Sequence, residues 1–421
     1  MLSALERYGA LAAKRISSLP PGLVQATPGR FDRIVIALSS GVDSSTCAAL
    51  YASHPHAELV YMRNWNHNQG DAPPERCDEQ DWKDAQRVAA HVNLPLRQLN
   101  FEREYWQDVF EAMLAGYERG ATPNPDVLCN RHVKFGALRA QLDAEYGAGN
   151  YWLVTGHYAR VLQKESRTSL LHAVDTHKDQ SYYLAQVKRG ALARTLLPLG
   201  HLLKPEVRAL AQELALPTAT KRDSQGICFV ENSQGAGRFR DFLQEYLPPT
   251  PGAIVTPDGK QWATHGGLWT HTLGQRVGGG LSLPQGSPEY RGTWYVAEKR
   301  VQENELVIVR GRDNPALYRE SVAVRSFEPL GLDGAQFAER ISTALAGGTL
   351  YMQYRSLQTP AQVLKCTVDN NTTDNDVSVN LTMAEPQRAM AVGQYCCLYD
   401  GEEVLGSGPI SATAGGPEPA M

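Results

Sequence analysis

Residues 34–50, IVIALSSGVDSSTCAAL, are the first candidates for chemistry in this chain. A β-branched apolar run leads into a loop of small residues, and a helix-like segment follows. Backbone N–H groups in such a turn, together with the N-terminus of the next helix, bind phosphate groups. Small residues let the phosphate oxygens approach the backbone. The pattern predicts a phosphate-binding loop, although a serine-rich turn without a ligand can share so short a motif.

The predicted loop contains no lysine, and the spacing G-x-x-x-x-G-K-[ST] is absent. Transfer of a γ-phosphoryl group uses that lysine on the β- and γ-phosphates. Its absence favours the other cleavage of a nucleoside triphosphate, in which the α-phosphorus is attacked and pyrophosphate leaves. Asp43 is then a candidate ligand for the Mg²⁺ ion that accompanies the pyrophosphate.

Two cysteines lie in polar, turn-rich segments, Cys129 in NPDVLCN and Cys228 in DSQGICFV. A thiolate is a strong nucleophile once its pKa falls, and its sulfur forms persulfides and disulfides. Asp126 precedes Cys129 by three residues, so one helical turn would place both on one face. Its carboxylate could accept a proton from a thiol or from a substrate. These residues are candidates for sulfur chemistry, provided that the fold brings the two cysteines together.

The chain has seven cysteines and no C-x-x-C pair, which argues against a zinc ribbon, a thioredoxin-like motif and a secreted disulfide scaffold. A single cysteine is usually a small buried apolar residue. We expect this of Cys47, Cys366, Cys396 and Cys397. Cys77, in the acidic segment ERCDEQ, stays undecided.

The length of 421 residues suggests two to four domains, at roughly 100–200 residues each. Hydrophobic residues make up 42% of the chain, which is typical of a globular protein. No apolar run approaches the roughly 18 residues of a membrane span, so no membrane partner is expected. The net charge of −4 excludes a strongly basic nucleic-acid-binding protein, so any RNA contact must come from a local patch.

The elements that would position these residues alternate between strands and helices. Periodic apolar patterns predict strands at 33–38, 57–65, 94–101 and 151–160 and helices at 44–53 and 79–92. Strands separated by helices imply an α/β domain, a doubly wound parallel sheet with helices on both faces. Ligands bind beyond the carboxyl ends of such strands, where Ser39, Met62 and Gly156 lie.

The pattern changes twice along the chain. We place the α/β domain at 32–221. Glycine and proline become frequent at 222–292, which predicts a small central linking domain. Short alternating runs at 293–412 predict an all-β, barrel-like domain. Residues 413–421 are expected to form a disordered tail.

Residues 1–31 differ from the rest of the chain. They carry four cations against one acid, and their apolar residues could form one helical face. Those apolar residues are Leu2, Leu5, Ala12 and Ile16. Such a segment is typical of a mitochondrial transit peptide. The alternative is a short amphipathic extension that packs on the body of the protein.

The loop SSGVDSS resembles the S-G-G-x-D-S-S loop of the ATP pyrophosphatase families. Further segments narrow the resemblance, because they occur in the same order as in the tRNA-specific 2-thiouridylase family, in particular its mitochondrial members. These segments are YMRNWN, TPNPDVLCNRHVKFG, TGHYAR, DTHKDQSYYL, KRDSQGICFV, THTLGQRVGGG, WYV and VGQY. The similarity extends over about residues 32–412, and an ordered set is more specific than any single motif.

The resemblance implies an enzyme that transfers sulfur to C2 of the wobble uridine in tRNA. ATP, with Mg²⁺, would adenylate the C2 oxygen and release pyrophosphate, and a persulfide on Cys228 would supply the sulfur. Cys129 would attack that persulfide, or released hydrosulfide would react, and a Cys129–Cys228 disulfide would close the cycle. Asp126 would complete the catalytic set. An iron–sulfur cluster held by these three residues stays open as an alternative.

The resemblance also implies the binding residues. The ATP residues are Ala37, Leu38, Ser39, Ser40, Gly41, Val42, Asp43 and Ser44, with Met62 and Gly156 near the adenine. The tRNA residues are Asn124, Pro125 and Asp126 around the target base, and His157, Lys178, Asp179, Gln180, Gln353, Tyr354 and Gln394 elsewhere. A structural histidine is the alternative for His157, and a solvated polar turn is the alternative for 178–180.

Two residues depart from the family pattern. Ser40 stands where the loop has the first glycine of its pair, and a serine there must avoid or tolerate φ > 0. Gln353 stands where the family has arginine, so one phosphate contact is expected to be lost unless Arg355 replaces it. Neither change removes the catalytic cysteines.

The remaining expectations concern partners and location. The resemblance implies a protein that delivers persulfide sulfur, and a mitochondrial location, with the cytoplasm as the alternative. Two other functions stay open. One is an amide-forming ligase with the same loop, which would not need Cys129 and Cys228. The other is a non-catalytic RNA-binding protein with a decayed nucleotide site, against which the intact Asp43, Asp126 and both cysteines argue.

Overall fold

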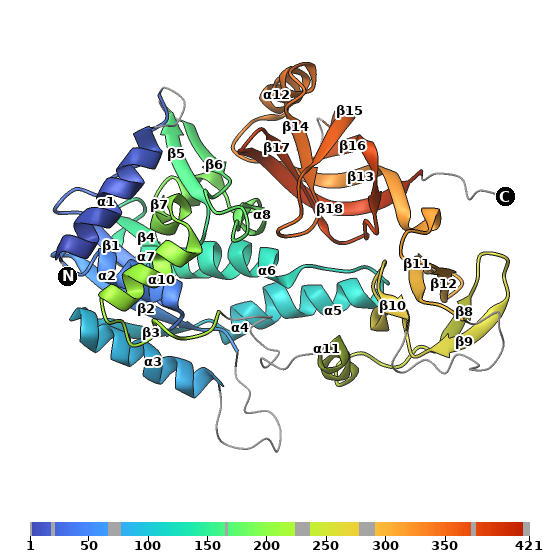
Figure 1. Cartoon of the computed structure of the whole chain (residues 1–421), viewed down its shortest axis with the longest axis horizontal. Coiled ribbons are helices and arrows are strands. Elements are labelled where there is room, and N and C mark those ends of the chain that lie inside the picture. Colours follow the sequence, from blue (N-terminus) through green and yellow to red (C-terminus); the bar gives the residue numbers. More distant parts are fainter. Residues whose placement is uncertain are drawn as a thin grey trace. The chain divides into compact units, whose positions relative to one another are not determined.

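The computed structural model describes residues 2–17, 22–65, 77–164, 167–223, 236–277, 291–371 and 376–415 (Figure 1). The chain divides into two compact units. The first unit comprises residues 1–109, 126–232 and 402–404, and the second comprises residues 110–125, 233–401 and 405–421.

A parallel sheet, five-stranded over the described residues, forms the centre of the first unit. In sheet order its strands are β3 (Leu96–Asn100), β2 (Ala57–Arg63), β1 (Arg33–Ala37), β4 (Tyr151–Val154) and β7 (Thr195–Leu196). The chain adds β2 and β3 on one side of β1, and β4 and β7 on the other. Ligands of such sheets bind where the strand order reverses, beyond the carboxyl ends of the strands. The predicted doubly wound sheet is confirmed, and its reversal point lies between β1 and β4.

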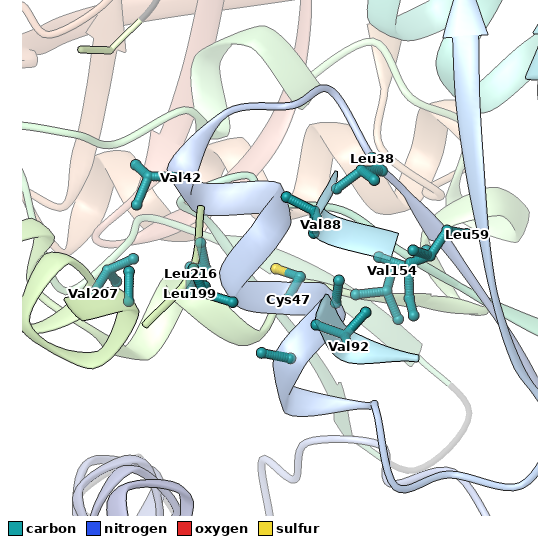
Figure 2. Close-up of a cluster of buried hydrophobic side chains, with 14 of the residues drawn as sticks. Leu38, Val42, Cys47, Leu59, Val88, Val92, Val154, Leu199, Val207 and Leu216 are labelled. Atoms are coloured by element: carbon teal, nitrogen blue, oxygen red, sulfur yellow. The ribbon is translucent and has the colours of Figure 1, made fainter. Parts of the chain in front are cut away.

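Helix α2 (Val42–Leu50) follows β1 directly and shares its core. Ile34 of β1 is fully buried, and Leu38 and Val42 are each 2% exposed. Figure 2 shows Leu38, Val42 and Cys47 in this apolar cluster. Because the side chains on both sides of the loop are held in the core, the loop between them is fixed at its two ends.

The other elements of the first unit surround the sheet. Helix α10 packs against α2 and α1, and α3 packs against α2 and β2. Their bounds, with those of the remaining elements, are α1 (Leu2–Ser17), α3 (Cys77–Val92), α4 (Glu102–Tyr105), α6 (Pro125–Leu128), the π-helix η2 (Cys129–Ala137), α7 (Leu138–Tyr146), β5 (Arg160–Lys164), β6 (Arg167–Leu171), α8 (Ser181–Leu184), α9 (Arg189–Leu192), the 3₁₀-helix η3 (Pro198–His201) and α10 (Lys204–Glu213). A second π-helix, η1 (Trp106–Phe110), leads from α4 into α5 (Glu111–Glu118), which belongs to the second unit.

The second unit contains two β structures. The first is a sheet of order β10-β11-β12-β8-β9. Its strands are β8 (Gly252–Val255), β9 (Gln261–His265), β10 (Arg276–Val277), β11 (Trp294–Arg300) and β12 (Glu305–Arg310), with α11 (Ala236–Gln244) and the 3₁₀-helices η4 (Leu268–Thr270) and η6 (Pro315–Leu317) nearby in sequence. This sheet includes β11 and β12, which follow the boundary predicted at residue 292.

The second β structure is a barrel of six described strands in the order β13-β16-β15-β14-β17-β18, which closes because β13 also pairs with β18. The strands are β13 (Tyr318–Pro329), β14 (Leu350–Gln353), β15 (Ala361–Asn371), β16 (Asp376–Arg388), β17 (Tyr395–Asp400) and β18 (Glu403–Ala414). Helix α12 (Gly334–Ala346) begins at Asp333, whose side chain accepts from Gln336 N. The predicted barrel is confirmed.

Some expectations about single segments need correction. Burial is confirmed for Cys47, Cys396 and Cys397, but Cys366 on β15 is only half-buried. The predicted tail is partly wrong, since β18 extends to Ala414; residues 416–421 lie outside the described residues. None of the helices in the described part of the chain is both long and apolar enough to span a bilayer.

Candidate functional site

The predicted phosphate-binding loop joins β1 to α2 and is closed by its own serines. The Ser39 N–H donates to the Ser44 hydroxyl at 3.1 Å, and that hydroxyl donates to the Gly41 carbonyl at 3.2 Å. The Ser45 hydroxyl donates to the same carbonyl at 2.8 Å. Gly41 directly precedes the first helical residue, so the loop ends at the N-terminus of α2. Its backbone is thus preorganised where a helix attracts anions.

Ser40 adopts the left-handed backbone conformation, with φ of +62°. Its side chain is buried, and its hydroxyl accepts a hydrogen bond from Lys221 Nζ at 3.1 Å. This conformation costs a non-glycine residue roughly 1–2 kcal/mol. Ser40 therefore tolerates φ > 0 rather than avoiding it, and the loop keeps the backbone turn that a glycine would favour.

Gly156, two residues after β4, lies against the first turn of α2. A Cβ atom added there would be 2.9 Å from the Ser44 nitrogen and 3.1 Å from the Asp43 carbonyl carbon. A side chain would fill this space, so a glycine is required for the close approach. Met62 is half-buried at the end of β2, the strand beside β1. The structure thus groups Gly156 with the loop at the point where the strand order reverses, and the helix N-terminus there fits a nucleotide phosphate.

The cation absent from the loop comes from the start of α10. Lys204 Nζ lies 2.7 Å from each carboxylate oxygen of Asp43 and 2.9 Å from Asp223 Oδ1. The Tyr158 hydroxyl donates to Asp43 Oδ1 at 2.8 Å. The Lys204 side chain is only 9% exposed, so its charge is held beside the loop by these two carboxylates.

Asp223 gathers further cations. Its carboxylate lies 2.8 Å from Lys178 Nζ and 2.5 Å from an Arg208 nitrogen, in addition to Lys204. Burial alone would raise the pKa of Asp223, but the hydrogen bonds and charges of Lys178 and Lys204 lower it to about 2. An open depression of about 730 Å³ is lined by these four residues. Asp175 also lines the depression, which therefore combines two carboxylates with three cations.

A second lysine, Lys221, also reaches the loop. Lys221 Nζ lies 2.7 Å from Asp81 and 2.7 Å from Asp84, both on α3, and also donates to Ser40. Burial lowers the pKa of Lys221, but the two carboxylates outweigh it and leave the pKa raised, so the lysine stays charged. Lys204 and Lys221 were not predicted. Lys221 begins the segment KRDSQGICFV, which was the one available signal.

The site also provides one carboxylate ligand, Asp43, for a divalent cation. Asp43 already attracts a positive charge, and carboxylate oxygens are preferred Mg²⁺ ligands. The described residues contain no group of three or more acidic, cysteine or histidine side chains that could hold a metal alone. Mg²⁺ commonly uses one or two carboxylates together with substrate phosphates. The residues present therefore fit a Mg²⁺ ion that arrives with a nucleotide.

The candidate nucleophile Cys129 lies where α6 passes into the π-helix η2. Cys129 is 5% exposed. Burial raises the pKa of Asp126, against the opposing charge of Lys134, so this carboxyl holds a proton more readily than an exposed aspartate. The Asn130 amide donates to the Asp126 carbonyl at 3.0 Å, which leaves its own buried oxygen without a partner. π-Helices frequently mark functional sites.

Cys228 lies outside the described residues, as does all of 224–235. Its approach to Cys129, and with it the sulfur relay and the disulfide, therefore stays a prediction.

His157 has the contacts of a structural histidine. It is 8% exposed, and its Nδ1 lies 2.7 Å from the Thr155 hydroxyl. Burial, aided by the charge of Lys134, lowers the pKa of His157 well below its usual value, so the ring is neutral. Its contact with RNA stays a prediction.

Residues 178–180 are not a uniformly solvated turn. Asp179 is 5% exposed and accepts from Ala173 N at 2.6 Å and from the Ser181 hydroxyl at 2.7 Å. The Gln180 side-chain oxygen accepts from Tyr158 N at 3.0 Å. The side chain of Lys178 is 40% exposed. Of the three side chains, that of Lys178 is the best placed to reach an RNA phosphate.

The second unit carries the other predicted tRNA residues. Gln353 is 2% exposed and its side-chain oxygen accepts from the Tyr399 hydroxyl at 2.9 Å. Tyr354 is 3% exposed and donates to the Arg388 carbonyl at 3.0 Å. The Gln394 amide donates to the Thr122 carbonyl at 2.7 Å. All three side chains are hydrogen-bonded within the protein. Their contacts with tRNA stay predictions.

The structure also describes Asn124 and Pro125, predicted to hold the target base, and Arg355, predicted to replace the family arginine. Asn124 is half-buried, and Pro125 begins α6. The guanidinium of Arg355 donates to the Ala389 carbonyl and lies over the Tyr354 ring, 5.3 Å from its centre. Its replacement of the family arginine stays a prediction.

The chain matches three family models in the expected order. Residues 32–232 match the "tRNA methyl transferase HUP domain", residues 240–310 the "tRNA methyl transferase PRC-barrel domain", and residues 341–410 the "aminomethyltransferase beta-barrel domain". These matches coincide with the parallel sheet, the central sheet and the barrel.

Full-length similarity is high. The chain is 50% identical over 418 residues to mitochondrial tRNA-specific 2-thiouridylase 1 of Saccharomyces cerevisiae, covering 97% of this chain and 98% of that protein. It is 39% identical over 396 residues to tRNA-specific 2-thiouridylase MnmA of Pseudomonas aeruginosa, covering 91% and 95%. The corresponding protein of Chromohalobacter salexigens is 39% identical over 389 residues, covering 92% and 94%.

Proposed function

The chain belongs to the tRNA-specific 2-thiouridylase family, and from this we infer that it is a tRNA-uridine 2-sulfurtransferase. It uses ATP to replace the C2 oxygen of the wobble uridine in tRNA by sulfur. The observation that carries this conclusion is an identity of 50% spread over 97% of the chain. An amide-forming ligase and a non-catalytic RNA-binding protein do not account for such similarity.

The loop serves the activation step. The backbone of residues 37–44 and the N-terminus of α2 bind the ATP phosphates, with Met62 and Gly156 on the adenine side. Lys204 and Lys221 supply the positive charge that the loop lacks. Mg²⁺, held by Asp43 and the phosphates, would neutralise charge on the departing pyrophosphate. Adenylation converts the C2 oxygen into part of a good leaving group, AMP.

The cysteines serve the sulfur step. A sulfur-donor protein places a persulfide on Cys228, and its outer sulfur is transferred to C2 as AMP leaves. The Cys129 thiolate attacks the inner sulfur, which releases hydrosulfide for the attack and forms a Cys129–Cys228 disulfide. A two-electron reductant then restores both thiols. Asp126, whose buried carboxyl has a raised pKa, takes up and returns a proton beside Cys129.

We assign the tRNA contacts to the predicted residues: Asn124 to Asp126 at the target base, with His157, Lys178 to Gln180, Gln353, Tyr354 and Gln394 as supporting residues. The buried members of this set, such as Gln353, act indirectly: their hydrogen bonds within the protein position the residues that contact tRNA. The domain boundaries at residues 32 and 222 and a mitochondrial location are part of the same proposal. The boundary predicted at residue 293 is too early, because β11 and β12 pair within the central sheet. The mitochondrial relative in Saccharomyces cerevisiae supports that location.

The test is a reconstituted reaction. Purified protein is incubated with ATP, Mg²⁺, unmodified tRNA and a persulfide source, and nucleosides are analysed by mass spectrometry. We expect tRNA-dependent pyrophosphate release and 2-thiouridine at the wobble position. Cys129→Ser and Cys228→Ser should both abolish 2-thiouridine, while Cys129→Ser keeps pyrophosphate release. Release without tRNA, or 2-thiouridine in the Cys228 variant, would contradict the proposal.

A further inference from the structure

Helix α1 is packed against the first unit. Ala4 is 6% exposed and belongs to the core cluster, against which Leu5, Tyr8 and Leu11 pack. The Tyr8 hydroxyl donates to the Pro198 carbonyl at 2.7 Å. The apolar face of the helix is therefore covered by the body of the protein, as the extension interpretation of this segment requires.

Two arginines of α1 pair with two glutamates of α10, and the two pairs differ in quality. Arg15 donates through both terminal nitrogens to the two oxygens of Glu206, at 2.7 and 2.9 Å, and also to the His201 carbonyl at 2.7 Å. Such forked pairs are the geometrically specific ones. Arg7 pairs with Glu213 at the other end of α10, where both side chains are well exposed. Exposed pairs contribute little.

The Arg15 pair lies at the turn that carries Lys204. Glu206 Oε2 also accepts from the Leu203 N–H at 2.7 Å, so one carboxylate both closes the first turn of α10 and receives Arg15. Lys204 is the first residue of that turn. Its N–H donates to Asp175 at 2.8 Å, and its Nζ reaches Asp43 in the loop.

We propose that α1 is a permanent part of the working enzyme and that Arg15 is a positioning residue, which through Glu206 holds Lys204 at the phosphate-binding loop. This rests on the proposed function, in which Lys204 meets the ATP phosphates. Removal of α1 would uncover the part of the core cluster against which Leu5, Tyr8 and Leu11 pack, and would leave Glu206 without its arginine. If residues 1–31 direct import into mitochondria, they must therefore do so without a cleavage that removes α1.

The test compares Arg15→Ala with Arg7→Ala in the full-length protein. Both remove an arginine that joins α1 to α10, but only Arg15 acts on the turn with Lys204. Calorimetry with a non-hydrolysable ATP analogue should give a Kd raised about threefold to tenfold for Arg15→Ala and changed less than twofold for Arg7→Ala. Arg15→Lys, which keeps the charge but loses the fork, should fall between wild type and Arg15→Ala. Equal Kd values for the two alanine variants would overturn the inference.

Two further measurements test whether Arg15 acts through Lys204 and whether α1 is retained in the mature protein. Lys204→Ala should raise the Kd itself, and adding Arg15→Ala to it should have almost no further effect, because residues acting in series are not additive; a full additional loss would overturn the inference. The intact mass of the mature protein from its cells should include residues 2–17, and a start beyond Ser17 would overturn it. A wild-type protein that binds ATP but forms no 2-thiouridine would refute the proposed function and leave the Arg15 comparison valid.

Discussion

At the scale of single residues, the site is built from charges that balance one another. Lys204 pairs with Asp43 and Asp223, and Lys221 pairs with Asp81 and Asp84. Removing one member of a buried pair leaves an uncompensated charge, which is costly. An ammonium group has three donors, so each lysine can keep one carboxylate and turn one of its other donors from its present partner to a phosphate oxygen. Nucleotide binding therefore needs no large rearrangement of these side chains.

Ser40 provides a prediction about stability, because its left-handed backbone can be separated from its hydroxyl. Ser40→Gly and Ser40→Ala both lose the hydrogen bond from Lys221, but only alanine keeps the strain at φ +62°. We expect the glycine variant to have the higher free energy of unfolding, by about 0.5–1 kcal/mol after allowance for the flexibility of glycine in the unfolded chain. Urea unfolding of both variants measures this. An alanine variant as stable as the glycine variant would show that residue 40 is unstrained.

At the scale of elements, the site follows from the reversal of strand order. The alternation of apolar strands and helices is enough to predict the parallel sheet, and hence that Ser39 and Gly156 lie at one edge. The predicted single strand at 151–160 is wrong in one respect: it divides into β4 and β5, because residues 155–159 form the turn that carries Gly156. The cations could not be predicted in this way, since Lys204 and Lys221 lie 161 and 181 residues from their loop partners.

The close approach of β4 and α2 gives a prediction with a matched control. Gly156→Ala places a Cβ 2.9 Å from a backbone nitrogen of α2, so the helix must shift. We expect a loss of about 1–3 kcal/mol in the free energy of unfolding, and weaker ATP binding. Gly190→Ala, in α9, meets nothing within 4 Å and should lose no stability and bind ATP normally. Calorimetry and urea unfolding test both variants. Normal ATP binding by Gly156→Ala would exclude the first turn of α2 from the nucleotide site.

At the scale of the whole molecule, sequence similarity extends over nearly the full chain, and the predicted site residues are divided between the two units. The nucleotide loop with Lys204 and Lys221 lies in the first unit, whereas Gln353, Tyr354 and Gln394 lie in the second. The order of motifs is sufficient to predict the family, and the short alternating runs of the C-terminal part are sufficient to predict the barrel. It is not sufficient to predict burial, because a motif gives no information on which side chains face the solvent. Asp179 and Gln353 show this, since both are buried and hydrogen-bonded within the protein.

The net charge of −4 makes tRNA binding dependent on a few local cations, and Lys178 is the exposed candidate among them. A lysine that neutralises one phosphate adds about 0.7–0.9 to the slope of log Kd against log salt concentration. Lys178→Ala should therefore weaken tRNA binding for any sequence and lower the slope by about 0.7–0.9. Arg7→Ala, which removes an equal charge from α1, should leave the slope unchanged. If Lys178 serves only to hold Asp223, its removal will lower stability and leave the slope at the wild-type value. The salt titration thus decides whether Lys178 contacts RNA or only pairs with Asp223.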